Sequence, residues 1–197
     1  MQQIMPFATQ VHIDLADGVF TPVKLTPIDQ VRWPNYMQAD IHVMYQEPFR
    51  HTRALINLHP RLIIVHAEAA GDFVAFAQQV HAAGIGVGVA LKPESLPQMI
   101  EPALDLIDHV LIFSGHLGHF GGEANTHLLT KVLYLRRLKP SLEIGWDGGI
   151  NAKNIKTLAS GGVSVLNVGG YIHHAPNPET AYENLLAALK QPHRRSR

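Results

Sequence analysis

The stretch RLIIVHAEA, residues 61–69, is apolar along its centre and carries the polar residues His66 and Glu68 only toward its end. Such nearly continuous hydrophobicity is typical of a strand that is covered on both faces, as in a parallel sheet. Runs of the same kind, short and rich in Val and Ile, recur along the chain. They are QVHIDLA (10–16), ADIHVMY (39–45), GIGVGVALK (84–92), DHVLIFSG (108–115), LEIGWDGG (142–149) and VSVLNVGG (163–170).

Helix-like segments separate these predicted strands, and several of them open at Asp or Asn and close at Gly, as helix capping predicts. They cover 47–58, 71–84, 96–108, 123–138, 151–162 and 177–191. Alternating strands and helices predict an α/β fold, either an open doubly wound sheet or a barrel. The Pro-rich stretch 21–38 predicts no regular element.

The polar residues favour one of these two architectures. Asp14, His42, His66, Glu68 and Asp147 all lie in or after the C-terminal halves of predicted strands. In a (β/α)8 TIM barrel these strand ends meet at one mouth, where active sites lie, whereas an open sheet would spread them along a crevice. We therefore predict a TIM barrel, with seven strands visible instead of the usual eight.

Composition limits the classes of function. The 197 residues include no cysteine, and 16 basic residues balance 16 acidic ones. We expect one barrel domain over 1–190, followed by a disordered basic tail over 191–197. The neutral balance disfavours a nucleic-acid partner, and no apolar run reaches the ~18 residues that span a membrane. With neither cysteine nor a signal peptide, the chain is expected to be cytoplasmic.

The stretch HIDLADG (12–18) places titratable side chains inside an apolar run. His12 and Asp14 are two residues apart and therefore point to the same face of a strand. Together with His42 and Asp147 they offer two imidazoles and two carboxylates at the predicted mouth. This donor set suits one divalent ion, Zn, Fe(II), Mn or Co, rather than Mg or Ca. The alternative for each histidine is a hydrogen-bonded residue of the core.

Pairs of glycines form a second group of candidates, because backbone amides in glycine loops at helix N-termini bind phosphate. In barrels the common phosphate site uses the loops after the last two strands. The alternative for each pair is a tight turn. The pairs are Gly121-Gly122, Gly148-Gly149 and Gly169-Gly170.

Seven short motifs, taken in order along the chain, match those of one known family. They are VHIDLADGVFTP (11–22), DIHVM (40–44), VHAEA (65–69), GVALKPESLP (88–97), FGG (120–122), WDGGIN (146–151) and VLNVGGYI (165–172). These motifs resemble HxDxMDGxFxPN, DxHLM, HxEA, GxALxPxTP, NPGFGGQ, VDGGI and VAGSAIF of the ribulose-phosphate 3-epimerases. The resemblance implies a TIM barrel of the ribulose-phosphate-binding type and an isomerase of the pentose phosphate pathway.

The resemblance also implies roles for particular residues. His12, Asp14, His42 and Asp147 would be the metal ligands, and Asp14 and Asp147 would also be the paired acid and base. The family interconverts D-ribulose 5-phosphate and D-xylulose 5-phosphate by moving a proton at C3 through a metal-stabilised enediolate. The glycine pairs would hold the phosphate of this sugar phosphate, and the chain would form a homo-oligomer.

Departures from the family pattern concern the shape of the substrate pocket. Ala16 and Phe113 stand where the family has methionine, and Val23 stands where it has asparagine. We place Phe113 in the pocket lining together with Met44 and His66. The changes at Ala16 and Val23 keep a hexulose 6-phosphate as an alternative substrate.

The N-terminus departs further, because the family has one strand and helix before the HxD strand. Here ten residues precede Val11. We hypothesise that Met1 is an internal methionine of a longer chain. This departure also motivates a third hypothesis, a barrel that binds a metal ion or a sugar phosphate without turnover.

Overall fold

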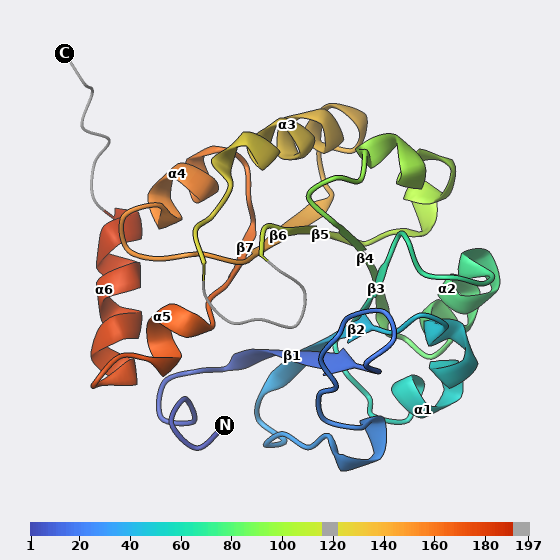
Figure 1. The fold of residues 1–197 in the computed structure, drawn as a ribbon, viewed down its shortest axis with the longest axis horizontal. Coiled ribbons are helices and arrows are strands. Elements are labelled where there is room, and N and C mark those ends of the chain that lie inside the picture. The colour runs from blue at the N-terminus through green and yellow to red at the C-terminus, as the bar shows by residue number, and fades with distance from the viewer. Residues whose placement is uncertain (116–121, 191–197) are drawn as a thin grey trace.

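The computed structural model describes residues 1–115 and 122–190, which contain seven parallel strands in one sheet. Each strand pairs with the next one along the chain, so the spatial order is β1 to β7. A doubly wound sheet would reverse this order at a switch point. The unbroken order instead curls into a nearly closed ring (Figure 1), which confirms the predicted TIM-type barrel. The strands are β1 (Gln10–Ala16), β2 (Gln38–Met44), β3 (Leu62–His66), β4 (Gly86–Leu91), β5 (His109–Phe113), β6 (Glu143–Asp147) and β7 (Val165–Asn167).

Helices surround the ring of strands (Figure 1). The α-helices are α1 (Thr52–Ile56), α2 (Phe73–Ala82), α3 (Leu129–Leu138), α4 (Ile155–Ser160), α5 (Gly170–His173) and α6 (Pro178–Lys190). The 3₁₀ helices are η1 (Ile28–Gln30), η2 (Pro48–His51), η3 (Pro97–Leu106) and η4 (Thr126–Leu128). Within the described ranges, no helix combines the length and the apolar character that crossing a membrane requires.

The helix-like segment 96–108 forms the 3₁₀ helix η3 instead of an α-helix. Pro102 lies inside it. Proline lacks the backbone N–H that an α-helix needs, and its ring clashes with the carbonyl four residues earlier. In contrast, α2 begins where the sequence predicts a cap, because the side chain of Asp72 accepts a hydrogen bond from the Ala75 amide.

Alternation along β1 separates the two faces of this strand. Val11 and Ile13 pack against an apolar cluster that also contains the fully buried Leu15. This cluster includes residues of α2, so these side chains face the helices. His12 and Asp14 therefore face the interior of the barrel.

Polar side chains brace the barrel at the N-terminal ends of the strands. Arg61 donates hydrogen bonds to both Asp40 carboxylate oxygens, at 2.7 and 2.6 Å, and to Glu143 Oε1, at 3.1 Å. Gln10 also donates to Asp40, at 2.8 Å, and His109 Nδ1 lies 2.8 Å from Glu143 Oε1. We call these five residues the bracing network. It connects β1, β2, β5 and β6 across the barrel.

A seam separates the first strand from the last, because no backbone ladder joins β7 to β1 in the part of the chain that the structure describes. Side chains of the described residues make contacts across this seam. The side-chain nitrogen of Asn167 in β7 lies 3.1 Å from His12 Nδ1 in β1. Outside the ring, Phe7 stacks on Tyr182 of α6 with ring centroids 5.0 Å apart. The ring is therefore held together at the seam by side chains.

Candidate metal centre and phosphate-binding loops

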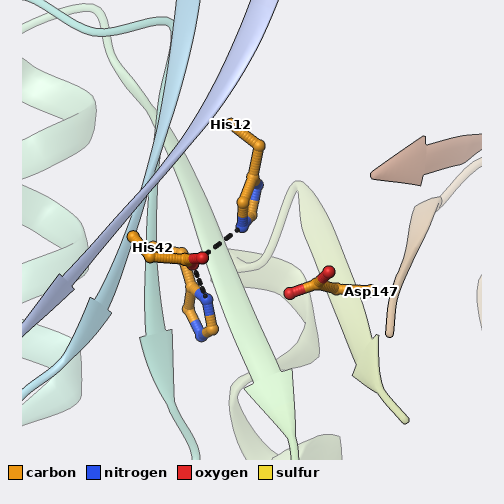
Figure 2. Close-up of side chains that lie close together, drawn as sticks. His12, His42 and Asp147 are labelled. Carbon is orange, nitrogen blue, oxygen red and sulfur yellow. Dashed lines mark hydrogen bonds and ion pairs between the residues drawn. The ribbon is translucent and has the colours of Figure 1, made fainter. Parts of the chain in front are cut away.

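The four predicted metal ligands lie together at the mouth of the barrel. His12 and Asp14 come from β1, His42 from β2 and Asp147 from the end of β6. One nitrogen or oxygen atom of each lies within 4.8 Å of the corresponding atoms of the others. Asp14 Oδ1 is 2.8 Å from His42 Nδ1 and 3.3 Å from His12 Nε2. In Figure 2, Asp147 comes from the opposite side with its carboxylate turned toward the two histidines.

The register of the sheet explains why these four side chains lie close together. Asp14 pairs with His42 across the β1–β2 ladder, so both side chains extend from one level of the barrel. Asp147 ends β6 and pairs with Asn167, the last residue of β7. Because all strands are parallel, these C-terminal ends converge on one mouth.

Charge is distributed unevenly between the two carboxylates of the site. Burial by itself would raise the pKa of Asp14, but the close contacts with the imidazoles of His12 and His42 hold it far below its usual range. Burial and the negative charge of Asp14 together raise the pKa of Asp147 well above its usual range. In the protein without a metal ion, Asp14 is therefore ionised, whereas Asp147 retains a proton more readily.

The two histidines differ in the same way. Burial opposes the charged form of His12, but Asp14 and Asp147 offset this effect and raise its pKa to about 8. Burial lowers the pKa of His42 to about 4, despite its contact with Asp14. His42 is therefore a neutral imidazole, the form that binds metal ions.

A cavity of about 570 Å³ opens beside these ligands and extends into the seam. At the mouth, its lining contains His12, Asp14, Asp147, Met44, Phe113, Gly122, Gly148, Gly149, Gly169 and Gly170. At the seam it is lined by side chains that include Phe7, Val11, Leu166 and Tyr182. Three predicted ligands, His12, Asp14 and Asp147, thus border the same space as the described glycines, whereas His42 is buried beside it. Gly121 lies outside the described residues.

The loop after β6 requires its glycines. Gly148 and Gly149 have φ values of +107° and +71°, which other residues rarely adopt. A Cβ atom on Gly149 would overlap the backbone of Ala124. The Gly148-Gly149 loop therefore packs directly on the segment that precedes η4.

Two predicted pocket residues, Met44 and Phe113, line the cavity, but His66 does not. His66 lies in β3, behind the ring of His42, and its Nε2 atom is 2.9 Å from His42 Nε2. The predicted place of His66 in the pocket lining therefore stays a prediction, since His66 is not among the residues that border this cavity. The His42 ring stands between His66 and the carboxylates, so His66 contacts a candidate ligand instead of the cavity.

Sequence reasoning missed Asn167, the partner of His12 across the seam. A signal for it was present, because Asn167 is a polar residue at the C-terminal end of an apolar run, as Asp147 is. It also missed Lys92 and Ser95, which contact Glu68 through the Lys92 amide and the Ser95 hydroxyl. Those contacts depend on loop conformation, which periodicity does not indicate.

The donor set fits a divalent metal ion. His12 Nε2 is buried and has no hydrogen-bond partner, although it points toward Asp14. Two imidazole nitrogens and two carboxylates suit Zn or a similar transition metal. Buried carboxylates are costly unless they are paired or bound to a cation, so a metal ion would satisfy both the orphaned nitrogen and the two acids.

The sequence matches the family described as the Ribulose-phosphate 3 epimerase family over residues 3–173. The chain belongs to this family. The family predicted from the seven motifs is confirmed, and so is the assignment to the isomerases.

Named relatives in the ribulose-phosphate 3-epimerase family agree with this assignment. The Ribulose-phosphate 3-epimerase of Schizosaccharomyces pombe is 30% identical over 181 residues, which cover 89% of this chain and 79% of that protein. The Ribulose-phosphate 3-epimerase of Bacillus subtilis is 31% identical over 172 residues, which cover 83% of this chain and 79% of that one.

Solved structures with this fold include a 3-hexulose-6-phosphate synthase, with a TM-score of 0.63 and 21% identity over 78% of this chain and 74% of that one. Another is the phosphoribosyl anthranilate isomerase of Thermococcus kodakaraensis, with a TM-score of 0.60 and 16% identity over 97% of this chain and 93% of that one. At these identities the similarity concerns the barrel fold alone.

Proposed function

We propose that this member of the family interconverts D-ribulose 5-phosphate and D-xylulose 5-phosphate by moving a proton at C3. The observation that carries the proposal is the position of Asp14 and Asp147, which come from β1 and β6 and border one cavity. Epimerisation needs two proton-transferring groups, one on each face of the reacting carbon. Two carboxylates from different walls of a barrel can approach a bound sugar from two sides.

Asp14 and Asp147 act in opposite protonation states. One carboxylate removes the C3 proton, and the other acid delivers a proton to the opposite face. The reverse reaction exchanges these roles. The two groups already differ in the protein without a metal ion, because the histidines keep the pKa of Asp14 low while burial and the charge of Asp14 raise the pKa of Asp147.

His12, Asp14, His42 and Asp147 would hold one divalent ion, of which Zn, Fe(II), Mn and Co are candidates. When bound, the ion would supply positive charge that stabilises the negative charge developing on the substrate when C3 loses its proton. His42 orients toward this site from a fully buried position.

The phosphate would lie against the backbone amides of the loops after β6 and β7. Gly148 and Gly149 follow β6, and Gly169 and Gly170 lie where α5 begins. All four border the same cavity as the carboxylates. Because glycine has no side chain, an anion can approach its backbone amide closely.

A pentulose phosphate is the better proposal than a hexulose phosphate. The hexulose alternative depends on Ala16 and Val23, and neither is among the residues that line the cavity. Ala16 is only 2% exposed. Neither position therefore contributes to the described lining of this cavity.

Solvent-deuterium exchange tests the proposed reaction. The purified protein, loaded with Co(II) or Zn(II), is incubated with ribulose 5-phosphate in deuterated water, and NMR follows deuterium at C3 together with xylulose 5-phosphate. We expect exchange with product formation. Exchange only with a hexulose 6-phosphate would transfer the proposal to that substrate, and bound metal without any exchange would contradict an epimerase function.

A further inference from the structure

A chain of hydrogen bonds lies behind the candidate metal centre. His42 Nε2 is 2.9 Å from His66 Nε2, and His66 Nδ1 is 3.1 Å from Glu68 Oε2. The chain therefore runs from a candidate ligand on β2, through β3, to the carboxylate that follows β3. His42 and His66 are 0% and 2% exposed, so solvent does not compete for their ring nitrogens.

The far end of this chain is fixed by two further donors. Glu68 Oε1 accepts a hydrogen bond from the Lys92 backbone amide at 3.2 Å and another from the Ser95 hydroxyl. Burial alone would raise the pKa of Glu68, but hydrogen bonds from His66 and Ser95 lower it to about 2. Glu68 is therefore a carboxylate at neutral pH, and a carboxylate only accepts hydrogen bonds.

Aromatic rings hold the middle of the chain in place. The ring of His66 packs against Phe20, with centroids 4.8 Å apart, and lies edge-on to Phe113 at 6.2 Å. Phe113 lies 6.1 Å from the His42 ring as well. Both imidazole rings are therefore packed against aromatic side chains.

The donor at each step follows from the step before. Because Glu68 accepts, His66 donates through Nδ1–H, and the Nε2 atom of a neutral His66 is an acceptor. His42 must then donate through Nε2–H, which leaves a lone pair on His42 Nδ1. That lone pair faces Asp14 Oδ1 at 2.8 Å. Two acceptors this close need a cation between or beside them.

We propose that Glu68 and His66 are positioning residues, which set the tautomer of His42 so that its Nδ1 atom offers a lone pair to the metal centre. The inference rests on the metal centre of the proposed function, but it does not depend on which sugar phosphate is the substrate. Outer partners of this kind orient metal-binding histidines, and their loss typically weakens metal affinity about 10- to 100-fold.

The substitution Glu68→Gln tests this role with almost no change of shape. The amide oxygen takes the position that accepts from the Lys92 amide, so the amide N–H₂ faces His66. His66 Nδ1 must then accept, and every donor in the chain reverses. His42 would carry its proton on Nδ1 and could not bind a metal through that atom.

A matched control exists at the opposite end of the barrel. Glu143 Oε1 lies 2.8 Å from Nδ1 of the buried His109, as Glu68 lies beside His66. The chain stops there, because His109 Nε2 has no hydrogen-bond partner. Glu143→Gln therefore removes a comparable carboxylate from a comparable histidine without touching the metal centre.

The experiment measures the affinity of metal-stripped protein for Co(II) from its visible absorption, for the parent protein, Glu68→Gln and Glu143→Gln. We expect a Kd about 10- to 100-fold weaker for Glu68→Gln and no comparable change for Glu143→Gln. Thermal unfolding of the metal-stripped proteins checks that both variants are folded. In the Zn(II)-loaded parent, ¹⁵N NMR should find the His66 proton on Nδ1.

Equal Co(II) affinity of the parent and Glu68→Gln would overturn the inference, as would a neutral His66 protonated on Nε2 in the Zn(II)-loaded parent. A parent protein that binds no Co(II) would also overturn it. If the parent binds Co(II) and Glu68→Gln weakens that binding, the inference stands even where ribulose 5-phosphate is not epimerised. That last result would contradict only the proposed reaction.

Discussion

Asp14 and Asp147 have opposite electrostatic surroundings although they border the same cavity. Asp14 contacts two imidazoles, at 2.8 and 3.3 Å, whereas the pKa of Asp147 is raised by burial and by Asp14. The charge of one carboxylate therefore affects the pKa of the other. Removing either charge changes both a candidate ligand and a candidate proton carrier.

We expect Asp14→Asn and Asp147→Asn each to reduce deuterium incorporation at C3 of ribulose 5-phosphate by at least about 100-fold, since an amide cannot carry the proton. Asp108→Asn serves as the control. Asp108 also contacts a histidine, His81 at 2.8 Å, but it lies at the start of β5, away from the mouth. An asparagine variant at position 14 or 147 that keeps the rate of the parent would contradict the assigned roles.

The sequence was sufficient to bring together His12, Asp14, His42 and Asp147, because strand alternation and parallel strand ends determine which side chains reach the mouth. It was not sufficient for His66. A two-residue period shows that His66 faces inward, but only the position of the His42 ring shows that His66 lies behind it. The partners of Glu68 belong to a loop after β4, and no local pattern indicates their distance.

At the scale of elements, the β6 loop depends on a close backbone approach that glycine permits. We expect Gly149→Ala to destabilise the fold by several kcal/mol, because it combines an unfavourable φ of +71° with overlap on Ala124. Gly84→Ala is the matched control. Its φ is +74° and nothing lies within 4 Å of the added Cβ, so it should cost only about 1 kcal/mol.

Urea unfolding of the metal-stripped variants measures the free energy of unfolding in both cases. The difference between the two alanine variants reports the contact with Ala124, since their backbone strain is alike. If Gly149→Ala were no more destabilising than Gly84→Ala, the loop after β6 would not be held by that contact.

The strands were predictable because nearly continuous apolar runs leave few alternatives. QVHIDLA (10–16) has the same bounds as β1, and five of the other six predicted strands each contain an observed one. The predicted strand 39–45 is shifted by one residue from β2, which begins at Gln38. The segment 96–108 was harder, since its apolar content suggests an α-helix while Pro102 favours the tighter η3. Within 21–38, where no element was predicted, η1 covers three residues.

At the scale of the whole molecule, the bracing network should make stability depend on pH in acid. A hydrogen bond from His109 lowers the pKa of Glu143 to about 2 and outweighs the effect of burial, with help from the charge of Arg61. Its pKa is lower in the folded chain than the ordinary value of 4.5, so Glu143 stabilises the fold above about pH 4.5. This contribution is lost as the pH falls toward about 2.

We therefore expect the free energy of unfolding of Glu143→Gln to approach that of the parent between pH 4.5 and pH 2, while the difference stays constant above pH 4.5. Urea unfolding across this range measures both proteins. Glu68, whose pKa is also about 2, is present in both and cancels. If the difference in free energy of unfolding does not change with pH, the contacts of Glu143 in the folded protein do not lower its pKa.

Within the described residues, β1 has a backbone partner on one side only, yet it supplies His12 and Asp14. Brief detachment of this strand would separate two of the four candidate ligands from the others, so metal binding and the attachment of β1 are thermodynamically linked. Amide hydrogens of β1 should exchange faster than those of β4, which is paired on both sides. A metal ion at 100 times its Kd should slow exchange in β1 about 100-fold. The ion would then stabilise the attachment of β1 in addition to its role in the reaction. If amide exchange in β1 does not respond to the metal ion, metal binding and the attachment of the strand are not linked.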